Sequence, residues 1–377
     1  MMTAAIRALA VLACVAGSPA VGQTVASDAA PASVTETSTV YTLIPITAGT
    51  QALRAASEDL GYTAEPDVVL AGLGLILVRH GLPEGVTGAE AIAALEGRVP
   101  EAVVGVNHAY RSQTSPAQAA PVLYADTLVD WPQSGCVARA RVGMIDGGVN
   151  VATPVLAGVQ VEQAVFGGGS PAGQRHGTEV ASVIADPARL SDVRLFNADV
   201  MADLGDGDIA GGAAQISQAL DWLVTQDVRI VNMSFAGPRN KLLALAVNRA
   251  TDQGLTLVAA VGNLGPQADP QYPAAFEDVV AVTAVDANMR VLRAAVRGDH
   301  VDLAAPGVDI FVAGASGGRY VSGTSMAAPF VTAMLATQGD ANPELLFSAA
   351  TDLGDQGKDP VFGHGLAKAP AGCAGDQ

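Results

Sequence analysis

From about residue 137 onward, short apolar segments alternate with longer segments whose apolar residues recur at helical spacing. The short segments are apolar almost throughout, which is typical of strands buried on both faces of a parallel sheet. They span residues 140–146, 193–200, 228–235, 255–262 and 279–285. The helical segments span residues 176–185, 211–226, 241–253 and 324–338. This alternation predicts an α/β domain with a parallel sheet and helices on both of its faces.

A different and smaller pattern precedes this domain, over residues 40–110. It predicts a small α+β unit whose elements are a strand at 40–46, a helix at 47–62, a strand pair at 67–80, a helix at 88–98 and a last strand at 103–111. Two polar stretches without periodicity flank this unit. Residues 23–39 are predicted to be a disordered linker, and residues 111–136 a linker that is easy to cut.

The first 22 residues have the pattern of an export signal. Arg7 provides the positive charge, an apolar run too short to span a bilayer follows, and Ala20 and Gly22 have the small-x-small form of a cleavage site. A second interpretation is open, because the run "VLAC" ending at Cys14 resembles the lipobox of bacterial lipoproteins. The pattern therefore predicts a secreted or periplasmic protein, with a lipid anchor at Cys14 as the alternative.

Composition narrows the class of protein. The chain has 377 residues, half of them hydrophobic, which is enough for a large core. The formal net charge of -17 argues against a nucleic-acid partner and fits solubility outside the cytoplasm. Once the signal is removed, Cys136 and Cys373 are the remaining cysteines. In an oxidising compartment this pair is expected to form a disulfide between the start and the end of the large domain, with two free thiols as the alternative.

Four polar side chains stand where strands end or helices begin in the predicted α/β domain. Asp146 ends a strand, His176 stands at the start of a helix, Asn263 follows a strand and Ser325 starts a helix. Each alone has an ordinary interpretation as a turn, cap or solvated residue. Ligand sites of parallel sheets lie beyond the carboxyl ends of the strands. Together the four residues supply the nucleophile, base, orienting group and oxyanion donor that acyl transfer needs.

The motifs around these residues carry a resemblance to a known family. The segments "VGMIDGGV", "HGTEVASVIA", "AAVGN" and "GTSMAAP", in this order, resemble signature blocks of the subtilisin-family serine peptidases, or subtilases. The resemblance covers roughly residues 137–370. It implies a subtilisin-like fold in which Ser325 attacks and His176 transfers the proton. It also implies that Asp146 orients the histidine and that Asn263, with the Ser325 N–H, holds the oxyanion.

The same resemblance implies further properties. The segment "VRIVNMSFAGP" resembles the strand that pairs with a substrate backbone, so the expected substrate-binding residues are Ser234, Phe235, Ala236 and Gly237. Polypeptides are the expected substrates, and no metal or other cofactor is expected. No Asp or Glu is evident among residues 234–237, which favours substrates with a neutral side chain before the cut bond.

Residues 40–110 resemble, in size and place, the N-terminal propeptide of the family. The resemblance implies a self-processed precursor whose own N-terminal domain acts as an intramolecular inhibitor of the peptidase domain at 137–373. We expect the cut between Tyr110 and Tyr124, and a monomer. Three alternatives stay open: a non-catalytic subtilisin-like binding module, a lipid-anchored surface protease, and residues 40–110 as a permanent interaction domain.

Several other polar residues are given structural interpretations. The run "DLGDGD" contains Asp203, Asp206 and Asp208, but it lacks the ligand spacing and terminal Glu of a calcium loop. We interpret it as a solvated loop at the rim of the cleft. Trp222 is assigned to a helical core stripe. The remaining histidines lack a partner pattern and are interpreted as structural: His80, His108, His300 and His364.

Overall fold

The computed structural model of the chain describes residues 38–112, 115–116, 124–168, 171–205, 208–314 and 317–373. The expected export signal at 1–22, with Cys14, and the expected linker up to residue 37 lie outside the described residues. Within the described ranges, no helix is both long enough and apolar enough to cross a membrane.

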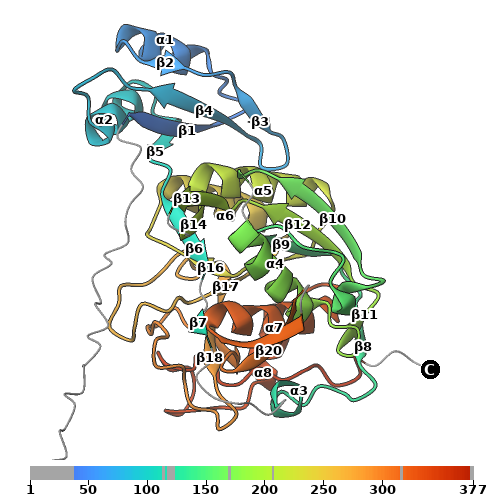
Figure 1. Cartoon of the computed structure of the whole chain (residues 1–377). Helices are drawn as coiled ribbons and strands as arrows, with labels where there is room; N and C mark the ends of the chain where they lie inside the picture. The colour runs from blue at the N-terminus through green and yellow to red at the C-terminus, as the bar shows by residue number, and fades with distance from the viewer. Residues whose placement is uncertain are drawn as a thin grey trace, which may run out of the picture. The chain divides into compact units, whose positions relative to one another are not determined.

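Among the described residues, seven parallel strands form the central sheet, in the order β10–β12–β9–β15–β17–β18–β19 (Figure 1). Their bounds are β9 (Val142–Asp146), β10 (Gln160–Val165), β12 (Arg194–Asp199), β15 (Ile230–Met233), β17 (Thr256–Ala260), β18 (Val279–Val285) and β19 (Leu303–Pro306). The five inner strands are the five predicted from apolar segments. The two edge strands, β10 and β19, were not predicted.

Helices cover both faces of this sheet, which confirms the predicted fold class for the large domain. α4 (Pro171–Ile184) and α7 (Thr324–Ala336) pack together on one face, and α5 (Ala213–Thr225) and α6 (Lys241–Asp252) pack on the other. Every residue of α7 is buried, and the helix contacts β15, β17, β18 and β19 of the sheet as well as α4. Shorter elements complete the domain: α3 (Ala125–Leu128), η1 (Pro154–Leu156), β20 (Ile310–Gly314) and α8 (Pro343–Ala349).

Residues 39–105 form a small α+β unit built on an antiparallel sheet. Its elements are β1 (Thr39–Pro45), α1 (Gln51–Asp59), β2 (Thr63–Ala64), β3 (Val68–Leu70), β4 (Leu75–Gly81), α2 (Gly88–Arg98) and β5 (Val103–Gly105). Alternate residues of β1 serve two cores. Val40 and Ile44 pack under α1 and α2, whereas Tyr41 and Leu43 belong to the core that includes α5 and α6.

Polar contacts join this unit to the two helices α5 and α6. Asp221 on α5 accepts a hydrogen bond from the Leu73 backbone N–H at 3.0 Å. Lys241 at the start of α6 forms an ion pair of 2.5 Å with Glu96 on α2. The small unit and the large domain therefore belong to one compact unit.

The predicted strand at 103–111 is wrong in one respect, because the structure has two strands there. β5 stays in the small unit, whereas β6 (Ala109–Ser112) pairs with β14 (Asp208–Gly212) and β16 (Phe235–Ala236) of the large domain. The polar residues between them explain the break. Asn107 bonds to Gln215 at 3.1 Å, and His108 Nδ1 lies 3.0 Å from the Asn240 side-chain nitrogen.

The interpretation of "DLGDGD" as a loop is also corrected. Asp203 and Asp208 lie on paired antiparallel strands, β13 (Ala202–Gly205) and β14, while Asp206 lies outside the described residues. A second antiparallel group places β7 (Ser115–Pro116) on β21 (Gly317–Ser322), and β21 in turn on β20. Each group combines a local hairpin, β13 with β14 or β20 with β21, with a strand from a distant segment. Local sequence patterns do not reveal the distant pairing.

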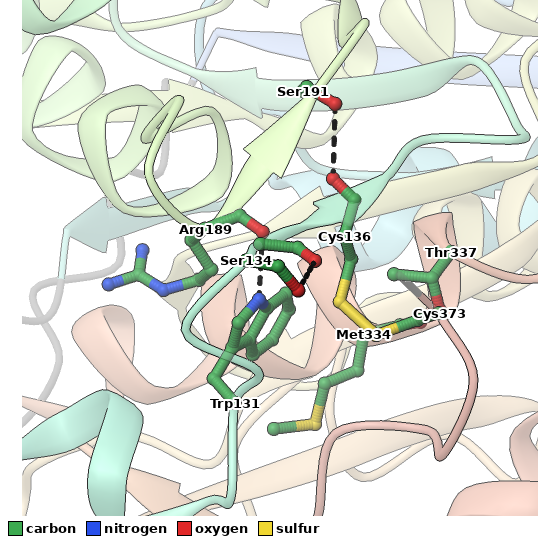
Figure 2. The surroundings of a disulfide bond; sticks show 9 residues. Trp131, Ser134, Cys136, Arg189, Ser191, Met334, Thr337 and Cys373 are labelled. Atoms are coloured by element: carbon green, nitrogen blue, oxygen red, sulfur yellow. Dashed lines mark hydrogen bonds between the residues drawn. A yellow bond between two sulfur atoms is a disulfide. The ribbon is translucent and has the colours of Figure 1, made fainter. Parts of the chain in front are cut away.

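A disulfide joins Cys136 and Cys373 in the structure, with an S–S distance of 2.02 Å (Figure 2). Cys136 lies on β8 (Cys136–Val137), which pairs with β11 (Leu190–Ser191). Trp131 packs beside it and donates from Nε1 to the carbonyl of Arg189 at 2.7 Å. The bond spans 237 residues, so it ties the segment that enters the large domain to its last described residue.

Candidate active site

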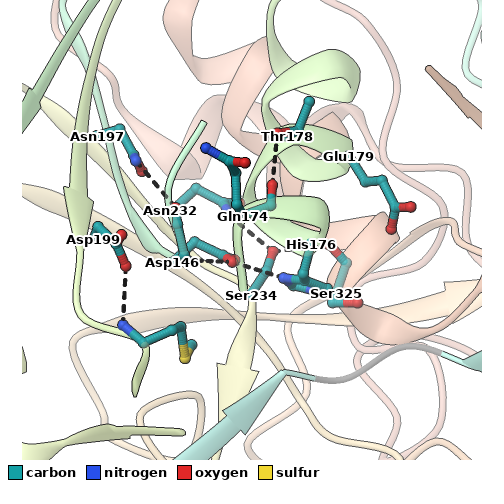
Figure 3. A network of polar contacts seen from close by, with 12 residues as sticks. Asp146, Gln174, His176, Thr178, Glu179, Asn197, Asp199, Asn232, Ser234 and Ser325 are labelled. Carbon is teal, nitrogen blue, oxygen red and sulfur yellow. Dashed lines mark hydrogen bonds and ion pairs between the residues drawn. The ribbon is translucent and has the colours of Figure 1, made fainter. Parts of the chain in front are cut away.

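Asp146 and His176 meet at the carboxyl edge of the central sheet (Figure 3). Asp146 is the last residue of β9, and its Oδ1 lies 2.7 Å from His176 Nδ1. Asp146 is 0% exposed and His176 is 4% exposed. The same Oδ1 also accepts the Gly147 backbone N–H at 2.7 Å. His176 Nε2 is buried and has no hydrogen-bond partner within the described part of the chain.

Glycines allow this close approach. α4 begins at Pro171, earlier than predicted, so His176 stands in its second turn rather than at its start. A Cβ at Gly147 would lie 2.1 Å from the Gly173 carbonyl oxygen, and one at Gly177 would lie 2.3 Å from the Gly147 carbonyl oxygen. Side chains at these positions would push α4 away from β9 and separate the two polar groups.

A second carboxylate acts on the histidine from the same helix. Glu179 on α4 is 3% exposed and forms a two-point ion pair with Arg319 on β21, at 2.6 and 2.9 Å. Burial alone would lower the pKa of His176, but the charge and hydrogen bond of Asp146 and the charge of Glu179 raise it above its ordinary value. Arg319 opposes this rise. These charges stabilise the positive charge that the His176 ring acquires when it takes up a proton.

Ser325 is the second residue of α7, the helix that packs against α4. It is buried, at the end of the helix where backbone N–H groups have no helical partner and where negative charge is stabilised. Asn263 is held nearby, because its Oδ1 accepts from the Thr324 N–H at 3.2 Å and the Thr324 hydroxyl at 3.1 Å. Those bonds fix the amide with its carbonyl toward Thr324 and its NH₂ facing the other way.

A chain of buried hydrogen bonds supports the backbone of Ser325. The Ser234 hydroxyl donates to the Ser325 carbonyl at 2.8 Å. Asn232 donates to Ser234 at 2.9 Å, and its Oδ1 accepts from Thr332 at 3.0 Å. All four residues are fully buried. Asn232 and Thr332 were not predicted, and their only signal is a polar residue inside an apolar strand or helix.

The four residues expected to bind substrate, 234–237, each contact other parts of this chain in the structure. Phe235 and Ala236 form β16, whose backbone pairs with Ser112 and Arg111 of this same chain. Ser234 points into the hydrogen-bond chain described above. Gly237 exchanges two backbone hydrogen bonds of 2.9 Å with Tyr272. A Cβ at Gly237 would also lie 2.5 Å from the ring of Tyr110.

Other polar groups near the site have structural partners. Asp199, at the end of β12, accepts the Met201 N–H at 3.2 Å, and burial raises the pKa of its carboxyl above the ordinary range. Trp222 packs against the core of α5 and α6, within 6.2 Å of the ring of Phe196. Among the described residues, no group of three or more His, Cys, Asp or Glu side chains could hold a metal ion.

The fold defines a parallel α/β protein whose polar cluster lies at the carboxyl edge of its sheet. The chain belongs to the subtilase family, because the family model matches residues 140–365. It is 34% identical over 210 residues to "Thermostable alkaline protease" of Halalkalibacterium halodurans, a match that covers 52% of this chain and 56% of that protein. The chain thus spans little more than half of that relative.

Two further relatives match over longer shares. "Subtilisin DY" of Bacillus licheniformis is 30% identical over 273 residues, which cover 67% of this chain and 96% of that protein. Among solved structures, fervidolysin from Fervidobacterium pennivorans, described as a keratinolytic enzyme related to subtilisin, superposes with a TM-score of 0.71 at 19% identity. That likeness covers 88% of this chain and 60% of fervidolysin, and it concerns the fold alone.

Proposed function

We propose that the protein is an exported serine endopeptidase that hydrolyses polypeptides through an acyl-enzyme intermediate. Ser325 attacks the peptide carbonyl while His176 Nε2 takes its proton, and the protonated histidine then gives that proton to the leaving amine. Asp146 holds the ring through Nδ1 and stabilises its positive charge. The side-chain amide of Asn263 and the Ser325 N–H bind the oxyanion. Water, activated by the same histidine, then releases the acyl group.

The observation that carries this proposal is the buried Asp146–His176 contact of 2.7 Å with an unpartnered Nε2. A buried imidazole nitrogen without a partner costs free energy. His300 Nε2 is also buried without a partner, so the feature that distinguishes His176 is its bond to the buried carboxylate of Asp146. His80 in the small unit, by contrast, has hydroxyls 2.9 and 3.0 Å from its two ring nitrogens. His176 instead keeps one nitrogen available for proton transfer.

A fluorophosphonate probe tests the proposal against the alternative of a non-catalytic binding module. We expect the probe to label the mature wild-type protein on Ser325 and to leave Ser325→Ala unlabelled. His176→Ala should label far more slowly, because the serine then lacks its base. Absence of labelling in folded, processed wild-type protein would favour the binding module.

We further propose that residues 38–112 are a propeptide that this enzyme removes by itself. The observation that supports this proposal is that residues 109–116 pair, through β6 and β7, with strands of the large domain. β6 runs antiparallel between β14 and β16, and three residues after it β7 pairs with β21, which leads directly to Ser325. Added strands of this kind are the ordinary way in which extended peptides bind to sheet edges. We therefore narrow the expected cut, between Tyr110 and Tyr124, to the bonds between Ser112 and Ser115.

The same contacts support inhibition by the cut product. Tyr110 is fully buried, its ring meets Phe235 edge-on at 6.0 Å, and its hydroxyl donates to the Pro238 carbonyl at 3.1 Å. After the cut, the contacts of β6, together with those of Asp221 and Lys241 to the small unit, would keep the cleaved propeptide bound. Its β6 strand would then occupy the place of a substrate strand until the propeptide is degraded.

N-terminal sequencing of wild type and Ser325→Ala from one host tests self-maturation. We expect a mature wild-type protein that starts at residue 113, 114 or 115 and an uncut Ser325→Ala precursor. Trimming of Ser325→Ala at the same bond would show that another protease makes the cut. If neither protein is cut, residues 38–112 are a permanent interaction domain. Fatty-acid labelling of Cys14 separates a lipid-anchored surface protease from a freely secreted or periplasmic monomer.

A further inference from the structure

A cavity lies at the opposite edge of the central sheet from Asp146 and His176. It measures about 680 Å³, within the range of small-molecule sites. Most of its walls are segments that lead into four neighbouring strands: residues 138–141 before β9, 157–160 at β10, 190–194 at β12, and Asp227 and Arg229 before β15. Because the strands are parallel, their first residues share one edge, and this edge is remote from the polar cluster at the strand ends.

Positive charge gathers in this cavity, although the chain as a whole carries a net charge of -17. Four arginines line it within the described chain, and Asp192 and Asp227 are the acidic residues among its lining. The cavity is therefore more positive than negative by two charges. The arginines come from three adjacent strands or their leading segments, and they are Arg139, Arg141, Arg194 and Arg229.

Only some of the N–H donors of these guanidinium groups bind other groups of the protein. Arg229 forms an exposed ion pair with Asp227 at 3.2 Å, and Arg141 donates to the Gln226 carbonyl at 2.7 Å. Arg139 and Arg194 are exposed, and their guanidinium groups have no hydrogen-bond or ion-pair partner among the residues that the structure describes. The guanidinium groups of Arg139 and Arg194 thus have all their N–H donors available at this cavity, and those of Arg141 and Arg229 have some.

We propose that this cavity binds a phosphate-bearing small anion or headgroup, with Arg139 and Arg194 as its main contacts. A phosphate dianion matches the two excess positive charges, and its oxygens accept the paired donors of a guanidinium fork. Such a ligand would bridge the starts of β9 and β12. It would stabilise the folded domain without entering the site at the carboxyl edge, so the inference does not depend on the proposed peptidase activity.

Titration calorimetry of the full-length Ser325→Ala chain with pyrophosphate in 0.15 M NaCl tests the proposal directly. We expect one site, and at least tenfold weaker binding in the double variant Arg139→Gln/Arg194→Gln. Arg249→Gln on α6 is the matched control and should bind as the parent does. Arg194→Lys keeps the charge but loses the fork, and it should bind more weakly than the parent.

Vesicles containing phosphatidic acid distinguish the source of the phosphate. Binding to vesicles that the double variant loses assigns a lipid headgroup, whereas binding to pyrophosphate without binding to vesicles assigns a soluble ligand. Equal affinity of parent and double variant, with circular dichroism showing both folded, would overturn the proposal. So would the absence of binding to both probes, or an equal loss of binding in Arg249→Gln.

Discussion

Acidification is predicted to open the small unit, because a histidine in its core is held in the neutral state. His80 on β4 is fully buried, and its nitrogens lie 3.0 Å from Ser57 Oγ and 2.9 Å from Thr42 Oγ1. Burial, assisted by the charge of Arg54, lowers the pKa of His80 from 6.5 to about 4. Both hydroxyls can accept a hydrogen bond from the protonated ring, so protonation would not cost a hydrogen bond. What opposes protonation is the burial of the charged ring away from water.

The sign and size of the effect follow from this depressed pKa. The unfolded chain takes up the proton near pH 6.5 and the folded unit only near pH 4. The neutral ring therefore stabilises the fold fully above about pH 6.5, and this stabilisation is lost as the pH falls toward 4. The complete loss amounts to about 3 kcal/mol. Between pH 7 and pH 5 it amounts to about 2 kcal/mol, or roughly a 20-fold rise in opening.

Hydrogen exchange measured by mass spectrometry on full-length Ser325→Ala provides the assay, since this variant should keep the small unit attached. Peptides from β1 and β4 should open roughly 20-fold more at pH 5 than at pH 7, after correction for chemical exchange. Peptides from β17 serve as the internal control. The pKa values of Asp67 and Glu90 lie below their ordinary values, so these carboxyls titrate below this window.

His80→Gln is the matched variant, because glutamine can donate and accept toward the same hydroxyls but does not titrate in this range. Its β1 and β4 peptides should show little change in opening between pH 7 and pH 5. If wild-type His80 and His80→Gln respond equally to pH, the buried histidine is not the cause and the reasoning is refuted.

Three further predictions concern the large domain. Asn263→Ala should lower kcat by roughly 10²–10³-fold with little change in KM, and a change confined to KM would instead make Asn263 a substrate-binding residue. Arg319→Leu should shift the acidic limb of the kcat/KM profile to higher pH, because the charge of Glu179 then raises the pKa of His176 without opposition from Arg319; an unchanged limb would exclude this coupling. In exported protein, alkylation without reduction should leave Cys136 and Cys373 unmodified by intact mass, and two added alkyl groups would rule out the bridge.

Sequence patterns predict the inner part of this fold better than its edges. The five inner strands are apolar throughout because both faces are covered, and that signal is local. β10 was missed because this edge strand contains exposed polar residues such as Gln160 and Glu162, so it is not apolar throughout. β6 was missed as a separate strand because its partners, β14 and β16, lie about a hundred residues further along the chain.

The candidate site shows the same division. Asp146, His176, Asn263 and Ser325 are predicted as site residues because each stands in a long motif, near the end of an expected strand or the start of an expected helix. The contact that brings Asp146 to His176 depends on backbone packing at glycines from separate segments, which spacing along the chain does not encode. The buried hydrogen bonds that hold the backbone of Ser325, including those of Asn232, were missed because a single polar residue in an apolar strand has many ordinary explanations.

Turnover of a peptide substrate by mature wild type, Ser325→Ala, His176→Ala and the double variant tests the central claim most directly. The variants are matured by adding a trace of active enzyme, which is then removed, so that only the catalytic step differs. Each single change should lower kcat by a similar large factor, and the double variant should be little worse, because nucleophile and base act as one unit. Near-normal turnover by folded, mature Ser325→Ala would contradict the assignment of Ser325 as the nucleophile.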